Sequence, residues 1–288
     1  MRVASKTIYD FVQSNLGSIT EELSKANKVV STGKRITNLS DDPVGLTQAL
    51  DIKSTLSNIE QLERNINLGK SWLNTAETTL NSVQNLISDT KALCVQMATA
   101  TTGAAERASA ATTIQNTLDE IISLGNTEVS GRYIFAGTNA DTTPFNEDGF
   151  YNGDNNPFTI KIGKDAKIVI GNDGSAVFGD IFQTLSDLKD ALEGNNVNGI
   201  EEAMSNLDNH FDHITAKISD IGSKINRMEI KEGILQDSNL FNTDRLSKVE
   251  DADIAEAIIT LNEIQLAYQA ALTSSTKVME LSLIDYLS

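Results

Sequence analysis

A seven-residue apolar repeat in the first half of the chain restricts its fold more than any other feature. Between residues 46 and 101, one heptad position holds Ile52, Ile59, Ile66, Leu73, Leu80, Ile87 and Cys94. Side chains spaced by seven form one stripe along an α-helix, and that stripe is stable only when another helix covers it. The repeat predicts a long helix that begins after a capping residue, Asp42, with Pro43 in its first turn, and ends at Gly103.

A second apolar stripe lies in the other half of the chain. Between residues 199 and 249 it consists of Leu207, Ile214, Ile221, Met228 and Leu235. A shorter helical pattern at 104–127 is expected to return along the first long helix. The fold class we predict is mainly α, a long antiparallel coiled-coil bundle built from both chain halves.

The two ends of the chain carry further apolar stripes with helical spacing. The first contains Ile8, Val12, Leu16, Ile19 and Leu23, and the second contains Ile258, Leu261, Tyr268, Leu272 and Leu283. An isolated helix of this length is marginal in water, so each stripe needs a partner. We predict that these residues form an assembly interface, in which each helix packs on the other and on copies of itself. Asp285 places a charge on the otherwise apolar last turn.

Charge supports contact between the two ends. Residues 1–40 hold six Lys/Arg and three Asp/Glu, whereas residues 248–288 hold two and seven. Opposite charges on two apolar helices favour their pairing and set its orientation. An ordinary solvated face is the alternative explanation of this imbalance.

The middle of the chain differs in kind. Helical periodicity fails between Gly131 and Gly179, where short apolar runs at 133–135, 158–162 and 167–170 alternate with Gly, Asn and Asp. These runs predict strands and turns. The chain is therefore expected to have three parts: a terminal helical assembly domain (1–40 and 252–288), a long-helix bundle core (41–131 and 196–251), and a small α+β outer insert (132–195).

Composition excludes several classes of function. A net charge of −17 argues against nucleic acid and against an anionic membrane surface. No apolar run approaches the roughly 18 residues of a spanning helix, and the polar N-terminus is not expected to be a cleavable secretory signal. One Cys excludes an intramolecular disulfide framework.

Candidate catalytic or metal-binding residues are few. His210 and His213 lie three apart beside acidic residues, but no third ligand is near, so a solvated helix face is the simpler interpretation. Cys94 falls on the apolar stripe and is expected to be a buried small hydrophobe. The pair Asp41 and Asp42 is explained by helix capping. We predict a protein that is not an enzyme and has no cofactor and no metal.

Several segments resemble the bacterial flagellin superfamily. The stretch 31–44, with Gly33, Asp41, Asp42 and Pro43, is similar to the motif that joins the terminal helix to the first long helix. Residues 220–229 and 249–256 are similar to the returning helix and its junction. A third stretch resembles the segment that leaves the core for the outer domain, and it contains Gly131, Arg132, Tyr133, Phe135 and Gly137.

The resemblance implies a secreted structural subunit of the bacterial flagellum at the junction between hook and filament. Its implied partners are copies of itself in a ring, the neighbouring hook-associated junction protein, flagellin, and a cytosolic export chaperone. Export unfolded through the flagellar type III apparatus is also implied, for which a chain without disulfides is suited.

Two other functions remain open at this point. Flagellin, the filament subunit, usually ends in a Leu-Leu-Arg-like stretch, which residues 279–287 lack. A secreted coiled-coil binding or effector protein would use the same export route and the same helices.

Overall fold

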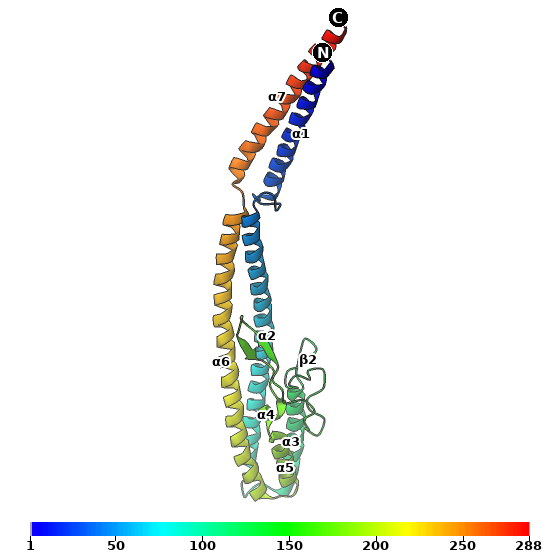
Figure 1. Cartoon of the computed structure of the whole chain (residues 1–288). Helices are drawn as coiled ribbons and strands as arrows, with labels where there is room; N and C mark the ends of the chain where they lie inside the picture. Colours follow the sequence, from blue (N-terminus) through cyan, green and yellow to red (C-terminus); the bar gives the residue numbers. More distant parts are fainter. Residues whose placement is uncertain (1, 288) are drawn as a thin grey trace. The chain divides into compact units, whose positions relative to one another are not determined.

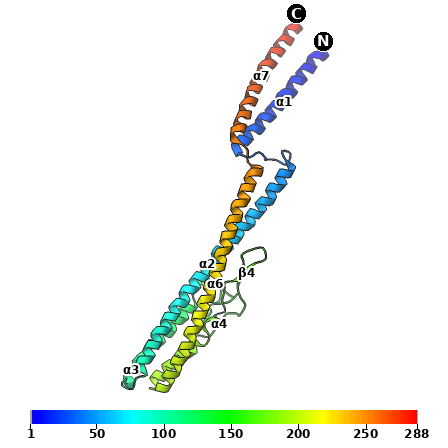
Figure 2. The same ribbon diagram turned by 90° about the vertical axis from the view of Figure 1, so that its left-hand side faces the viewer.

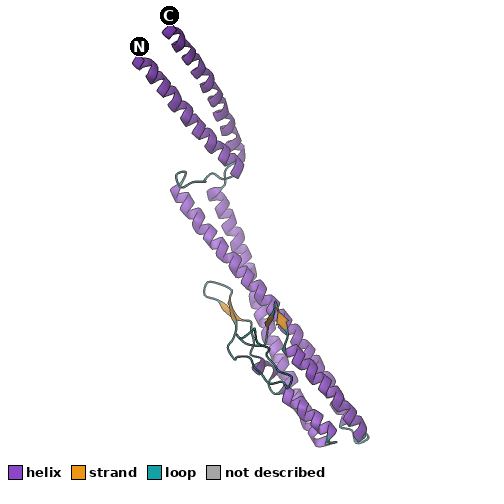
Figure 3. Cartoon of the chain, turned by 90° about the vertical axis from the view of Figure 1, so that its right-hand side faces the viewer, coloured by secondary structure: helices purple, strands orange, loops and turns teal. Residues whose placement is uncertain are grey.

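The computed structural model describes the backbone of residues 2–287 and the side chains of residue 7 and residues 9–277. The predicted interface residues Ile8, Leu283 and Asp285 lie outside the residues whose side chains are described. Helices dominate, and the strands are short (Figures 1 and 3). The elements in chain order are α1 (Arg2–Thr32), α2 (Pro43–Met97), α3 (Ala104–Gly125), β1 (Glu128–Val129), β2 (Arg132–Tyr133), β3 (Thr159–Lys161), β4 (Lys167–Val169), α4 (Gly174–Phe178), α5 (Ile181–Glu193), α6 (Val197–Glu250) and α7 (Ile254–Leu287).

The chain forms two compact units. Residues 1–57 and 239–288 make up the first, which we call the terminal unit, and residues 58–238 make up the second, the central unit. Both chain ends lie in the terminal unit, where α1 and α7 pack side by side (Figure 2). Among the described helices, none is both long and apolar enough to span a membrane.

Local sequence accounts for the start of α2. Asp42 precedes the helix, and its Oδ1 accepts a hydrogen bond from the backbone N–H of Gly45 at 2.9 Å. Pro43 occupies the first helical position, where its missing N–H costs nothing. The predicted cap and first turn are therefore confirmed.

The predicted end of α2 at Gly103 is wrong. The helix ends at Met97, and Gly103 instead precedes α3. The buried Arg107 explains the early end, because its Nε donates to the carbonyl oxygen of Met97 at 2.8 Å and its Nη2 to that of Thr99 at 3.0 Å. A cation at a helix C-terminus satisfies carbonyl groups that have no partner within the helix.

In the central unit, α2 and α6 run antiparallel. Lys70 pairs with Glu232 at 2.9 Å, whereas Lys91, further along α2, pairs with Asp208, further back on α6. Every residue of the predicted α2 heptad stripe is buried, and four of the five on α6 are too; Leu235 is half-buried. The long antiparallel bundle is confirmed.

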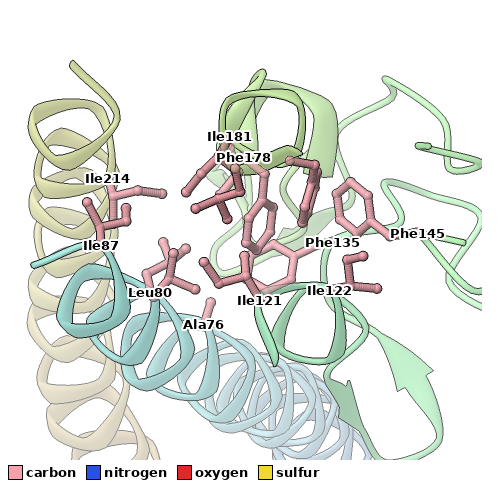
Figure 4. Close-up of a cluster of buried hydrophobic side chains, with 14 of the residues drawn as sticks. Ala76, Leu80, Ile87, Ile121, Ile122, Phe135, Phe145, Phe178, Ile181 and Ile214 are labelled. Atoms are coloured by element: carbon pink, nitrogen blue, oxygen red, sulfur yellow. The ribbon is translucent and has the colours of Figure 1, made fainter. Parts of the chain in front are cut away.

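The short strands form two antiparallel pairs, β1 with β2 and β3 with β4. Their side chains join the same core as α2, α3, α5 and α6, with no separate core of their own. In Figure 4, Phe135 and Phe178 lie beside Ile121 of α3, Phe145 lies on the side of Ile122, and Ala76 and Leu80 of α2 lie on the other side of Ile121. The rings of Phe135 and Phe178 meet edge to face at 5.1 Å. Residues 132–195 are therefore fastened to the bundle by shared packing.

Candidate assembly surface

The terminal helices α1 and α7 cover part of each other's apolar surface. Val12, Leu16, Ile19 and Leu23 of α1 are all half-buried. On α7 the half-buried positions are Ala257, Leu261, Ile264, Tyr268, Ala271 and Ser275. Steps of three and four place each set on one face, so the structure pairs these faces within one chain.

A second apolar surface on α7 stays exposed. Ile258 and Leu272, predicted at the interface, are 44% and 40% exposed and lie beside the paired face. Three more apolar side chains of this helix are exposed: Ile254, Ile259 and Leu266. We call these five residues the α7 outer surface. Apolar side chains left exposed on a helix are candidates for protein–protein contact.

The α1–α7 pair is connected to α2 and α6 by a compact joint. The chain leaves α1 at Gly33, where a positive φ of 70° suits glycine. Two backbone hydrogen bonds then join the segment after α1 to the end of α6 and the segment after it. Arg35 N–H donates to the Glu250 carbonyl at 2.7 Å, and Ala252 N–H donates to the Gly33 carbonyl at 2.9 Å. The ends of α1 and α6 are thus held together directly.

A buried carboxylate lies at the centre of this joint. Glu250, which ends α6, accepts from Lys34 at 2.8 Å and from Lys53 at 2.7 Å. Burial alone would raise the pKa of Glu250, but the hydrogen bonds and charges of the two lysines outweigh it and lower the pKa below its ordinary value. The carboxylate is therefore held in its charged form.

Asp41 orders the loop between α1 and α2. Its Oδ2 accepts from the backbone N–H groups of Asn38 at 2.8 Å and Thr37 at 3.1 Å. These hydrogen bonds lower the pKa of Asp41. Asp41 and Asp42 thus have separate structural roles, one in the loop and one at the helix cap.

The segment from Gly131 to Gly137 begins the insert. Gly131 and Gly137 have φ values of 75° and 69°. A Cβ on Gly137 would lie 2.2 Å from the carbonyl oxygen of Asp154, so only glycine fits there. Phe135 is fully buried, Tyr133 is half-buried, and Arg132 lies 5.7 Å from the ring centre of Phe158. This segment packs the start of the insert against its surroundings.

His213 is exposed, as expected for a solvated helix face, whereas His210 is half-buried, and both have hydrogen-bond partners. Nε2 of His213 donates to the Ala176 carbonyl at 3.0 Å, and Nε2 of His210 lies 3.0 Å from Thr184 Oγ1. Burial lowers the pKa of His210, with the charge of Asp180 opposing it. Both side chains attach α6 to the insert, a long-range pairing that helical periodicity does not reveal.

The described residues hold no chemistry typical of an active site. They contain no group of three metal-binding side chains. Cys94 is buried, and burial raises the pKa of its thiol to about 11, which keeps it protonated. An open groove of 540 Å³ between α5 and α6 is lined by Asp187, Asp190 and Glu202, and the hydroxyl of Thr184 in it is hydrogen-bonded to His210. The α7 outer surface is therefore the candidate functional site.

Known proteins similar to this chain are components of the bacterial flagellum. Residues 3–140 match the bacterial flagellin N-terminal helical region. The chain is 25% identical to flagellar hook-associated protein 3 of Salmonella typhimurium over 98% of both chains. It is 29% identical to a Salmonella berta flagellin over 77% of this chain but only 39% of that protein. The crystal structure of Bacillus cereus FlgL is 26% identical, with a TM-score of 0.62 over 68% of this chain and 99% of that one.

The chain is similar to proteins of the flagellin superfamily. Within it, the relatives matched along nearly their whole length are hook-associated proteins 3, whereas flagellin is matched over much less than half of its own length.

Proposed function

We propose that this chain is a structural subunit of the bacterial flagellum that forms the junction between hook and filament. The observation that carries the proposal is the match over 98% of both chains to hook-associated protein 3. The exposed α7 outer surface supports it, because a subunit that assembles needs apolar surface left over after its own helices have paired. The location that follows is outside the cell, on the flagellum.

The partners follow from that position. We propose contacts with copies of the chain in a ring, with the neighbouring hook-associated junction protein on one side, and with flagellin on the other. A cytosolic export chaperone is the further partner proposed, since an apolar terminal helix needs cover before assembly.

We propose that three parts of the chain have different roles. Residues 1–40 and 252–288 serve assembly, residues 41–131 and 196–251 form the bundle core, and residues 132–195 are the outer insert. Val12, Leu16, Ile19 and Leu23 would keep α1 on α7, while Ile258 and Leu272 would contact a neighbouring subunit. A structural subunit of this kind has no catalytic role.

Immunogold labelling of intact flagella tests the proposal. A junction subunit gives one spot at the distal end of the hook. Label along the filament would instead favour flagellin, and label absent from flagella would favour a secreted coiled-coil effector. Either of these two results would overturn the proposal.

A deletion strain separates the same alternatives in a second way. Cells without the junction subunit are expected to keep their hooks and to shed flagellin into the medium, because the first flagellin has nothing to bind. Purified chain is expected not to grow long filaments even when seeded. Normal filaments on the deletion strain, or micrometre filaments of pure protein, would contradict the proposal.

A further inference from the structure

The buried carboxylate at the joint of the terminal unit binds two elements at once. Glu250 is the last residue of α6 and is 6% exposed. Its Oε1 lies 2.8 Å from Nζ of Lys34, just after α1, and its Oε2 lies 2.7 Å from Nζ of Lys53, within α2. One side chain therefore connects the end of α6 with the end of α1 and the start of α2.

We propose that Glu250 is a positioning residue that locks the α1–α7 pair to the start of α2 through Lys34 and Lys53. The inference concerns the free subunit. Only its consequence, that the lock presents the α7 outer surface to neighbouring subunits in a defined direction, rests on the proposed function.

The lock combines a buried acceptor with partly solvated donors. Glu250 is buried, whereas the side chains of Lys34 and Lys53 are 44% and 40% exposed, so water screens part of the attraction. The backbone contributes two hydrogen bonds at this point, Arg35 N–H to Glu250 and Ala252 N–H to Gly33. Neutralising Glu250 would leave two lysines facing each other, so the backbone bonds beside them should open more often.

Other charged groups surround the joint but bind elsewhere. Arg35 Nη2 donates to the Val249 carbonyl at 3.0 Å and lies 3.4 Å from Asp42. Asp251 accepts from Ser247 Oγ at 2.6 Å, and Asp253 accepts from the backbone N–H of Ala255 at 2.9 Å. Because these charged groups lie around the joint, the contribution of Glu250 must be read as a difference between wild type and variant.

Amide hydrogen exchange of the full chain, resolved by NMR, tests the lock directly. The amides of Arg35 and Ala252 report the joint, and those of the central unit serve as an internal reference. For Glu250→Gln we expect protection at both reporter amides to fall about threefold to tenfold. Glu229→Gln, the same change at an exposed position of α6, is the matched control and should stay within about twofold.

A pH series separates a charge lock from simple packing. In the wild type, the exchange protection of the Arg35 amide should fall as acid protonates Glu250. In Glu250→Gln, the protection of this amide should not show that fall with pH. Lys53→Met provides a second test if Glu250→Gln loses helicity, and should lower protection at the same two amides. Unchanged protection in a folded Glu250→Gln, or in Lys53→Met, would overturn the inference, whatever the immunogold result.

Discussion

Single residues decide the geometry at several points of this chain, and glycine is the clearest case. Gly137 has a positive φ and no room for a Cβ beside Asp154, whereas Gly131 has a positive φ but open space around it. Backbone strain is therefore common to both positions, and only Gly137 adds a steric clash. The two glycines form a natural pair for comparison.

Gly137→Ala is expected to destabilise the central unit by roughly 2–5 kcal/mol, because the clash adds to the strain. Gly131→Ala should cost about 1–2 kcal/mol from strain alone. Urea unfolding followed by the fluorescence of Trp72 measures both, because this single tryptophan packs 5.5 Å from Phe158 of the insert. Equal losses in the two variants would argue against the clash.

Asp41 gives a prediction on pH. The pKa of Asp41 is lower in the folded protein than in the unfolded chain. Its carboxylate therefore stabilises the fold at pH values above the pKa of the unfolded state, and this stabilisation is lost as the pH falls through the pKa of the folded state. Protection of the Thr37 and Asn38 amides should therefore decline in acid. Asp41→Asn should remove that acid-dependent decline, as amide exchange between pH 5 and the acid range would reveal. An unaltered profile in the variant would assign the effect to another group.

Helices can be predicted from the sequence where the pattern of apolar and capping residues that defines them is local and periodic. The α2 stripe and its Asp42 cap are set by spacing and neighbouring residues, and both agree with the structure. The end of α2 was missed, because it depends on a side chain ten residues away, Arg107. The joint at Glu250 was missed for the same reason, since its lysines lie about two hundred residues away in sequence.

The α7 helix shows a different limit of prediction from the sequence. It is apolar on more than one side, so periodicity alone does not say which face meets α1. Leu261 and Tyr268 lie on that face, while Ile258 and Leu272 do not. Sequence therefore identified the interface residues as one set, and the structure separates them into an inner and an outer surface.

Burial in the α2 stripe predicts a large effect of truncation. Leu80 is fully buried, and Leu80→Ala should cost about 2–5 kcal/mol through lost contacts and the cavity left behind. Val95 lies on the same helix at 59% exposure, and Val95→Ala should change stability by less than about 0.5 kcal/mol. Chemical denaturation compares the two. A similar small loss for both would mean that the stripe is not packed as described.

At the scale of the whole molecule, the terminal and central units differ in how far their apolar side chains are buried. The central unit has a continuous core that joins α2, α3, α5, α6 and the insert. The terminal pair α1–α7 has no fully buried side chain among its described residues. A helix pair with so little burial opens readily, so the two units should differ in local stability.

Deleting residues 1–35 or residues 254–288 is therefore expected to leave a soluble, helical, monomeric protein. The central unit keeps its core in either truncation, because the apolar stripes of α2 and α6 cover each other without the terminal helices. Circular dichroism should show helicity lost in proportion to the residues removed, and light scattering should show a monomer. Loss of most of the helicity would mean that the central core depends on the terminal helices, contrary to the two compact units found here.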